Sequence, residues 1–151
     1  MYKNHHQPSK RQYPDSPKVG VGAIVLKDDK VLLIRRGVAP SKGMWAVPGG
    51  LLKLGETLQE GVERETLEET GVTVKAKQPV YTFDFLEKDD NGCFRFHYVI
   101  VDLLAEYVCG KAKAADDALE ARWVSAEMLE SLPMPRNMLR ALESVGFISG
   151  K

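Results

Sequence analysis

The sequence predicts a single domain of the mixed α/β (α+β) class, with a helix on each side of a β-sheet. Strand-like segments precede and follow one helix at 57–70, and a last helix begins at Pro135. A chain of 151 residues, 44% of them hydrophobic, suits one core rather than two. No linker or repeat interrupts residues 17–148, so they are predicted to form one domain.

Residues 1–16 are polar, contain two prolines and show no periodicity, so they are predicted to be a flexible N-terminal arm. The arm contains His5 and His6. Adjacent histidines in a polar tail are more often solvated than bound to a metal, and we expect no metal site here.

The domain opens with a predicted hairpin. Apolar residues alternate over 19–26, Asp28-Asp29 form a turn, and 31–34 form the return strand. Gly20 and Gly22 fall on one face of the first strand, which suggests close approach by another backbone or by a ligand.

The next apolar stretches, 44–47 and 51–54, are separated by Pro48-Gly49-Gly50. Later strands are expected at 72–87, 94–107 and 120–124, followed by a short helix at 126–131 that Ser125 can cap. The segment 96–105 is nearly all apolar apart from His97 and Asp102, as expected for a central strand.

The helix at 57–70 has a start signal and a stop signal. Thr57 and Glu60 have the spacing of a capping box, in which each side chain binds a free backbone N–H of the other. Gly71 supplies the residue that ends the helix in a left-handed conformation.

This helix carries an unusual acidic cluster. Glu65, Glu68 and Glu69 share one arc near the C-terminal end, where carboxylates repel one another and the helix dipole disfavours them. Leu58 and Val62 lie on the same side, so the cluster continues the inward face. A solvated acidic face is the ordinary explanation of such a run. A hard cation would offset all of these costs at once.

The segment GGLLKLGETLQEGVERETLEETGV resembles the signature of the Nudix hydrolase family, G-x5-E-x7-R-E-U-x-E-E-x-G-U, where U is a bulky apolar residue. The lead-in GMWAVPGG and the strand VLLIRR also look like this family. Eight of the nine signature positions match, and Thr66 is the one departure: Gly50, Glu56, Arg64, Glu65, Thr66, Glu68, Glu69, Gly71 and Val72.

The resemblance implies an α/β/α sandwich with a mixed β-sheet between helices. It also implies a pyrophosphohydrolase that depends on Mg²⁺, with Mn²⁺ as a substitute. Carboxylate-bound divalent metals neutralise a diphosphate and activate water. The metal ligands implied are Glu65 and Glu69 first, then Glu68, with Glu56 and the carbonyl of Gly49 as further candidates.

The catalytic roles are carried over in the same way. Arg64 would orient a glutamate, although an ordinary surface ion pair is the alternative. The general base would be Glu68, or a loop acid among Asp116, Asp117 and Glu120. Glu120 is the best loop candidate because the pattern E-x-R-W resembles the family at this place.

Four residues are expected to contact substrate: Arg35, Arg36, Gly50 and Trp45. Only one of the two arginines can point to the site, because neighbours in a strand alternate. Trp45 could stack a base, as could three phenylalanines, although strand aromatics more often belong to a core or a dimer surface: Phe83, Phe85 and Phe96.

The segment 13–57 most resembles the ADP-ribose pyrophosphatase branch. This implies hydrolysis of a nucleoside diphosphate linked to another moiety, with ADP-ribose giving AMP and ribose 5-phosphate. The alternatives are a nucleoside triphosphate pyrophosphohydrolase that cleans the nucleotide pool, and a non-catalytic nucleotide-binding sensor.

The expected partner is a small-molecule nucleotide. Lys and Arg total 21, as do Asp and Glu, so net charge argues for neither nucleic acid nor membrane binding. Cys93 and Cys109 form no metal motif and are expected to be buried or half-buried thiols. With no apolar run long enough to span a membrane, a cytoplasmic location is expected. The branch resembled commonly forms homodimers, so a homodimer is an open expectation.

Overall fold

The computed structural model describes residues 11–150. Within them the chain forms a mixed seven-stranded sheet whose main path runs β3-β2-β1-β6-β5, with β4 paired to β1 and β7 paired to β2. The elements are β1 (Lys18–Lys27), β2 (Lys30–Arg36), β3 (Trp45–Ala46), β4 (Gly49–Leu51), α1 (Leu58–Thr70), β5 (Thr73–Lys88), β6 (Phe94–Cys109), β7 (Ala118–Ser125), α2 (Ala126–Leu129) and α3 (Arg136–Ser144).

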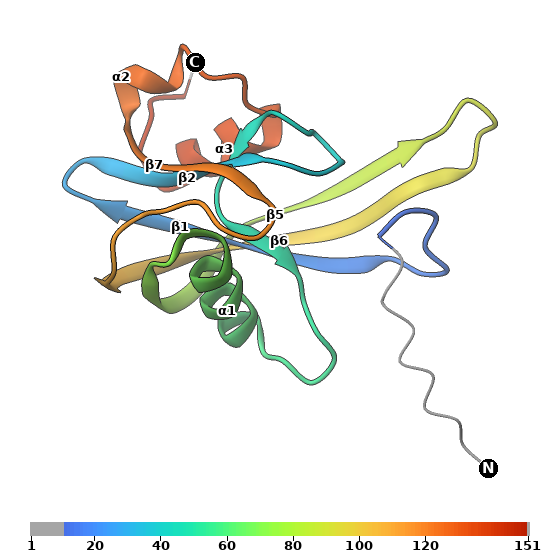
Figure 1. The fold of residues 1–151 in the computed structure, drawn as a ribbon. Coiled ribbons are helices and arrows are strands. Elements are labelled where there is room, and N and C mark those ends of the chain that lie inside the picture. Colours follow the sequence, from blue (N-terminus) through green and yellow to red (C-terminus); the bar gives the residue numbers. More distant parts are fainter. Residues whose placement is uncertain (1–10, 151) are drawn as a thin grey trace.

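The helices cover opposite sides of the sheet, with α1 on one side and α2 and α3 on the other (Figure 1). One core cluster joins α1 to β1, β5 and β6 and includes the fully buried Val62 and Leu103. The other joins α3 to β2, β3 and β7 and includes the fully buried Leu33 and Leu142. The predicted mixed α/β class with helices on both faces is therefore confirmed.

Strand β1 is the organising strand of the sheet. Along most of its length it pairs with β6 in parallel, from Lys18 opposite Tyr98 to Val25 opposite Ala105. On its other side, residues 20–22 pair with β4 and residues 26–27 pair with β2. Because β1 changes partners along one edge, the sheet opens between β4 and β2, and the segments that build the site converge there.

The two glycines of β1 lie at close approaches, as expected. A side chain at Gly20 would collide with the side chain of Ile100, and one at Gly22 would collide with Asp102. The backbone of β4 also comes close, since a Cβ at Gly49 would lie 2.9 Å from Cα of Gly22, and both glycines line a cavity.

Helix α1 has the predicted ends. The hydroxyl of Thr57 accepts the backbone N–H of Glu60 at 3.1 Å, and Gly71 has a φ of 72°. The second bond of the capping box, from the backbone N–H of Thr57 to the Glu60 carboxylate, differs from expectation. The Thr57 hydroxyl donates to that carboxylate instead. Thr66, the departure from the signature, is fully buried and donates to the carbonyl of Val62 at 2.7 Å, so its extra polar group is satisfied.

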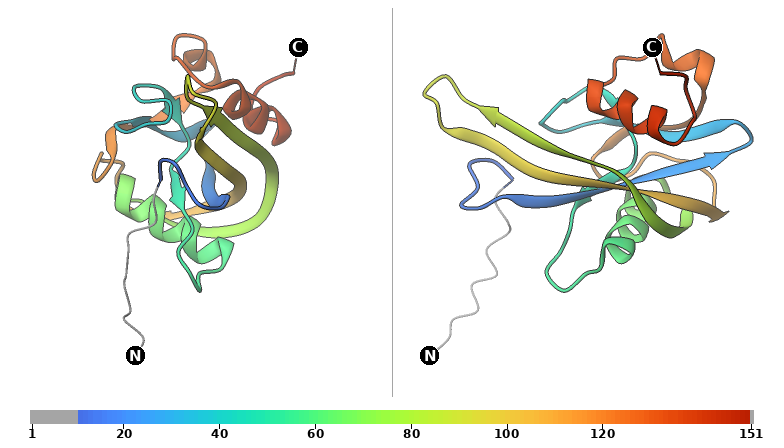
Figure 2. Two further views of the ribbon diagram at one scale, coloured as in Figure 1. Left: turned by 90° about the vertical axis from the view of Figure 1, so that its right-hand side faces the viewer. Right: turned by 180° about the vertical axis from the view of Figure 1, so that it is seen from behind.

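Strands β5 and β6 form a long antiparallel hairpin whose turn projects beyond the rest of the sheet (Figure 2). In the turn, Asp89 accepts the backbone N–H groups of Asn91 and Cys93, both at 2.9 Å. The predicted arm lies partly outside the described residues, His5 and His6 included. Its described part lies against this hairpin, where the backbone N–H of Tyr13 donates to the carbonyl of Arg95.

Strand β4 includes the glycine turn, because residues 49–51 pair with β1. Two local expectations were wrong. Ser125 precedes α2 without a side-chain capping bond, and this helix ends at Leu129. Cys93 and Cys109 are exposed rather than buried or half-buried. No helix among residues 11–150 has the length and apolar character needed to cross a membrane.

Candidate active site

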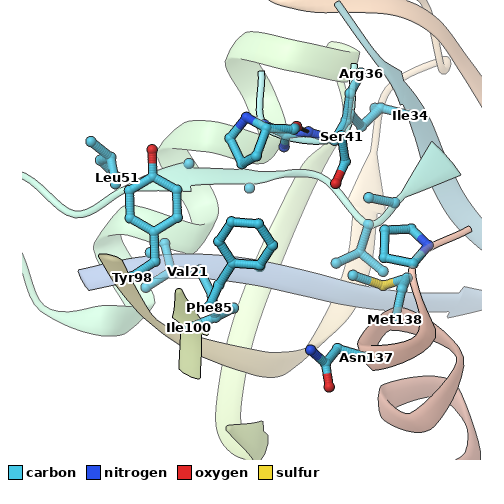
Figure 3. Close-up of a pocket in the computed structure, with 18 of the residues that line it drawn as sticks. Val21, Ile34, Arg36, Ser41, Leu51, Phe85, Tyr98, Ile100, Asn137 and Met138 are labelled. Carbon is cyan, nitrogen blue, oxygen red and sulfur yellow. Dashed lines mark hydrogen bonds between the residues drawn. The ribbon is translucent and has the colours of Figure 1, made fainter. Parts of the chain in front are cut away.

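A cavity of about 380 Å³ lies where the opened sheet meets α1, the loop after β2 and the start of α3. Figure 3 shows Arg36 and Ser41 on one side of this cavity, Tyr98 and Phe85 on another, and Met138 and Asn137 opposite. The acidic helix contributes two of the lining residues, Glu65 and Glu69. The cavity therefore combines an acidic wall with an aromatic one.

The acidic wall is built against the glycine turn of β4. The carboxylate of Glu65 occupies the space a side chain would fill at Gly50, with both oxygens 2.6 Å from that Cβ position. Oε1 of Glu69 accepts the backbone N–H of Gly49 at 2.7 Å. Glycine at position 50 thus allows the Glu65 carboxylate to approach the turn directly.

Both carboxylates are buried, at 9% exposure for Glu65 and 5% for Glu69. Burial raises the pKa of Glu69 to about 8, and the hydrogen bond from Gly49 only partly opposes this. Burial also raises the pKa of Glu65, against the stabilising effect of Arg64. Two neighbouring carboxyl groups are therefore held where their charged forms are poorly compensated.

Arg64 organises the polar side of α1. Its Nε and Nη2 donate to the two oxygens of Glu56 at 2.6 and 2.8 Å, and Nη1 donates to Glu65 at 2.7 Å. Nη2 also donates to the carbonyl of Leu51 at 3.1 Å. These bonds hold the pKa of Glu56 down to about 2. Arg64 thus ties the loop before the helix to one of the two buried carboxylates.

Glu68 differs from its two neighbours. Its side chain is 43% exposed and reaches only Nη1 of Arg64, at 3.3 Å. Among residues 11–150, no three Asp, Glu, His or Cys side chains are grouped as a metal site. The predicted cluster of three glutamates is therefore a buried pair, Glu65 and Glu69, with Glu68 turned outward.

This pair nevertheless suits a divalent cation. Mg²⁺ binds a few carboxylates and completes its shell with water and phosphate oxygens, so a full protein cage is not required. A cation beside Glu65 and Glu69 would also compensate the charge that burial destabilises. Glu56 is already bound by Arg64 on both oxygens, which makes it a poorer ligand in this arrangement.

The two arginines at the end of β2 point to different places. A register shift in the pairing with β7 falls between Arg35 and Arg36. Arg36 lines the cavity, and its Nε donates to the carbonyl of Pro40 at 2.7 Å. Arg35 instead faces Glu120 on β7, with 3.6 Å between Nη1 and Oε2.

Five other predicted site residues lie outside the cavity lining: Glu56, Arg64 and Glu68 around α1, and Glu120 and Trp45. The last two are held elsewhere. Glu120 contacts Arg35 and Arg122 on β7. Trp45 is 4% exposed and belongs to the core cluster of α3. In this structure neither is placed to contact a molecule in the cavity. Asp117 is the loop acid that does line it, and it forms an ion pair with Arg11 at 3.2 Å.

Several lining residues were missed as site residues. Phe83 and Phe85, considered earlier only as alternatives, stand on the same face of the hairpin as Tyr98 and Ile100. Asp102 also lines the cavity, and its only sequence signal was its position in an otherwise apolar strand. The face of the sheet on which these residues lie depends on pairing between strands that are distant in sequence.

The chain is similar in sequence to known proteins. A model of the NUDIX domain matches residues 16–144. A protein of Methanocaldococcus jannaschii named ADP-ribose pyrophosphatase is 38% identical over 116 residues, which make up 77% of this chain and 66% of that protein. The chain thus matches slightly less than two thirds of that relative's length.

Solved structures share the fold. A MutT NUDIX hydrolase from Burkholderia pseudomallei superposes with a TM-score of 0.73 at 30% identity, covering 87% of this chain and 99% of that one. A MutT protein from Methanosarcina mazei Go1 gives a TM-score of 0.68 at 26% identity, covering 88% of this chain and 94% of that one.

Proposed function

Since this chain belongs to the NUDIX family, we propose that it hydrolyses the diphosphate of a nucleoside diphosphate linked to another group, with Mg²⁺ as the metal and ADP-ribose as the substrate. The products would be AMP and ribose 5-phosphate. The observation that carries this proposal is the buried pair of Glu65 and Glu69 against the glycine turn, on the wall of a cavity large enough for a nucleotide.

Glu65 and Glu69 are the proposed metal ligands, together with the carbonyl of Gly49. Bound there, the cation would neutralise charge on the diphosphate and lower the pKa of a coordinated water. Arg64 fixes the position of Glu65 through the bond at 2.7 Å. It is therefore a positioning residue that holds one ligand carboxylate in place.

The remaining steps fall to Arg36 and Glu68. Arg36 would bind a phosphate of the substrate, because it lines the cavity and carries a guanidinium that can donate two hydrogen bonds to one phosphate. Water attacks one phosphorus, the bond from that phosphorus to the bridging oxygen breaks, and the second phosphate leaves with the bonding electrons. The proton lost by water would go to Glu68, which stands on α1 between the ligand residues and is not buried.

The choice of ADP-ribose is supported by two observations. The relative from Methanocaldococcus jannaschii carries the name ADP-ribose pyrophosphatase. The aromatic wall of Phe85 and Tyr98, with ring centroids 6.2 Å apart and planes 26° apart, offers a stacking surface for a base.

Product analysis tests the proposal. Purified protein with Mg²⁺ is incubated with ADP-ribose or with nucleoside triphosphates, and the products are separated by chromatography. AMP with ribose 5-phosphate supports the proposal, whereas pyrophosphate release from triphosphates alone would replace it with the pool-cleaning activity. If Glu69→Gln binds nucleotide as wild type does and wild type hydrolyses nothing, the protein is a sensor.

Two further properties are proposed, the compartment and the oligomeric state. The exposed thiols of Cys93 and Cys109 suit a reducing compartment such as the cytoplasm. A homodimer, as expected for the branch resembled, is tested by analytical ultracentrifugation. A single species at the mass of 16.8 kDa would exclude a stable dimer at the concentration used.

A further inference from the structure

Asp102 is an acid placed where the fold gives it no partner. It lies on β6, opposite Gly22 of β1 and Tyr81 of β5. Its exposure is 0%, and neither Oδ1 nor Oδ2 has a hydrogen-bond partner among the described residues. A buried polar group without a partner costs stability, and such groups are rare in native structures.

The surroundings leave room for this carboxyl group. A Cβ at Gly22 would collide with Oδ1 of Asp102 and would lie 3.0 Å from Cγ2 of Val47. Glycine at position 22 is thus what allows an acid at position 102. An apolar residue on β6 would avoid the cost of burial, so packing alone gives no reason for this pair.

Asp102 also lies at the cavity, with its carboxyl oxygens shielded from it. Asp102 is one of its lining residues, on the same face of the sheet as Ile100, Phe83 and Phe85. Figure 3 shows the aromatic ring of Phe85 beside Ile100 at the floor, with Met138 on the opposite side. The floor therefore combines flat apolar surfaces with one unpartnered polar group, which is typical of a site that orients a planar ligand.

We propose that Asp102 binds the adenine base of the substrate, with one carboxyl oxygen accepting a hydrogen bond from the 6-amino group and the other donating to the ring nitrogen beside it. This inference rests on the proposed function, and adds to it the group that selects the base. A protonated carboxyl presents one donor and one acceptor side by side, as the 6-amino edge of adenine requires.

The protonation state fits this role. Burial raises the pKa of Asp102 to about 7, and no charged neighbour opposes the shift. The oxygens have almost no accessible surface, so a base reaches them only when part of the floor moves.

A double-mutant cycle with an altered ligand tests this contact. Calorimetry with Mg²⁺ measures the binding of AMP and of purine riboside 5′-monophosphate, which lacks only the 6-amino group. Wild type is expected to bind AMP about 10-fold more tightly. Asp102→Leu, which removes both polar atoms, is expected to bind the two ligands equally within about twofold.

Asp102→Asn is the matched variant, because an amide also presents a donor beside an acceptor, and it is expected to keep the preference for AMP. Asp84→Asn changes an exposed acid on β5 and is expected to behave as wild type. Thermal melts check that each variant folds. If the larger side chain of Asp102→Leu prevents folding, Asp102→Val is used instead, and its binding of the two ligands is compared in the same way.

An unchanged preference for AMP in Asp102→Leu or Asp102→Val, or no preference in wild type, would overturn the inference, and Asp102 would then be a structural residue bound to internal water. The proposed function is judged separately by hydrolysis of ADP-ribose. Loss of the preference for AMP in the apolar variants, with ADP-ribose hydrolysed by wild type, supports both.

Discussion

Arg64 binds Glu56 with two parallel hydrogen bonds, of 2.6 and 2.8 Å, and so joins the loop before α1 to the helix itself. The same guanidinium donates to Glu65 at 2.7 Å. With its side chain only 19% exposed, Arg64 is more than a surface ion pair. The position of a buried carboxylate therefore depends on a residue that does not itself line the cavity.

Replacing this arginine tests that dependence. Arg64→Lys keeps the charge but cannot bind Glu56 at two points and Glu65 at the same time. We expect kcat to fall about 10–100-fold, as is usual for residues that orient a metal ligand. The Mg²⁺ concentration needed for half-maximal activity should rise as well. Arg122→Lys, which changes an exposed arginine on β7, is the control, and equal effects of the two changes would contradict the positioning role.

The neighbouring arginines of β2 provide a matched pair. Arg36 lines the cavity, whereas Arg35 faces Glu120 across the β2–β7 pairing. Arg36→Gln is therefore expected to raise KM about 10-fold through loss of a phosphate contact. Arg35→Gln should change KM less than about twofold, because exposed ion pairs contribute little. The reverse order of effects in steady-state kinetics would show that the substrate approaches from the β7 side.

The general base is tested by three single carboxyl-to-amide changes. Glu68→Gln is expected to lower kcat about 100-fold or more, within the range of general-base catalysis, while substrate binding is little affected. Glu120→Gln should leave kcat within about threefold, since Glu120 lies on β7, where it contacts Arg35 and Arg122 rather than α1. A large loss of kcat in Asp117→Asn, with Glu68→Gln near wild type, would transfer the role to the loop.

Much of the site was predictable because it is local in sequence. The ends of α1 follow from Thr57 and Gly71, and the inward direction of Glu65 and Glu69 follows from helical periodicity. A helix presents its residues in a fixed angular order, so the acidic wall could be placed without knowledge of the rest of the fold. The close fit of Glu65 over Gly50 depends on the same signature segment.

The remainder depends on contacts between distant segments. Trp45 and Phe85 are both strand aromatics, yet one lies in the core and the other on the cavity floor, because β3 pairs with β2 whereas β5 pairs with β6. The irregularity between Arg35 and Arg36 could not be seen in the sequence. Asp102 meets Gly22 only through the parallel pairing of β1 and β6, for which the chain carries no short-range signal.

The buried glutamates also predict how stability depends on pH in the absence of metal. The pKa of Glu69 is about 8 in the folded protein, against an ordinary value of 4.5, so the folded state retains a proton that the unfolded state loses first. The stability this proton provides is fully present below about pH 4.5 and is lost as the pH rises to about 8. Asp102 acts in the same direction up to about pH 7.

In EDTA, the melting temperature of wild type should therefore fall as the pH rises from 5 to 8. Between pH 7 and pH 8 Asp102 contributes least, so in this range the melting temperature of Glu69→Gln should change less with pH than that of wild type. At pH 8, Glu69→Gln is expected to melt above wild type without metal, because it removes a buried carboxylate that lacks a compensating cation. Saturating Mg²⁺ should reverse that order, because a free Mg²⁺ concentration ten times the Kd stabilises wild type by about 1.4 kcal/mol.

Asp84→Asn is the control and should follow wild type throughout. Melting curves of Glu69→Gln that shift with Mg²⁺ as much as those of wild type would show that the cation does not bind at this carboxylate.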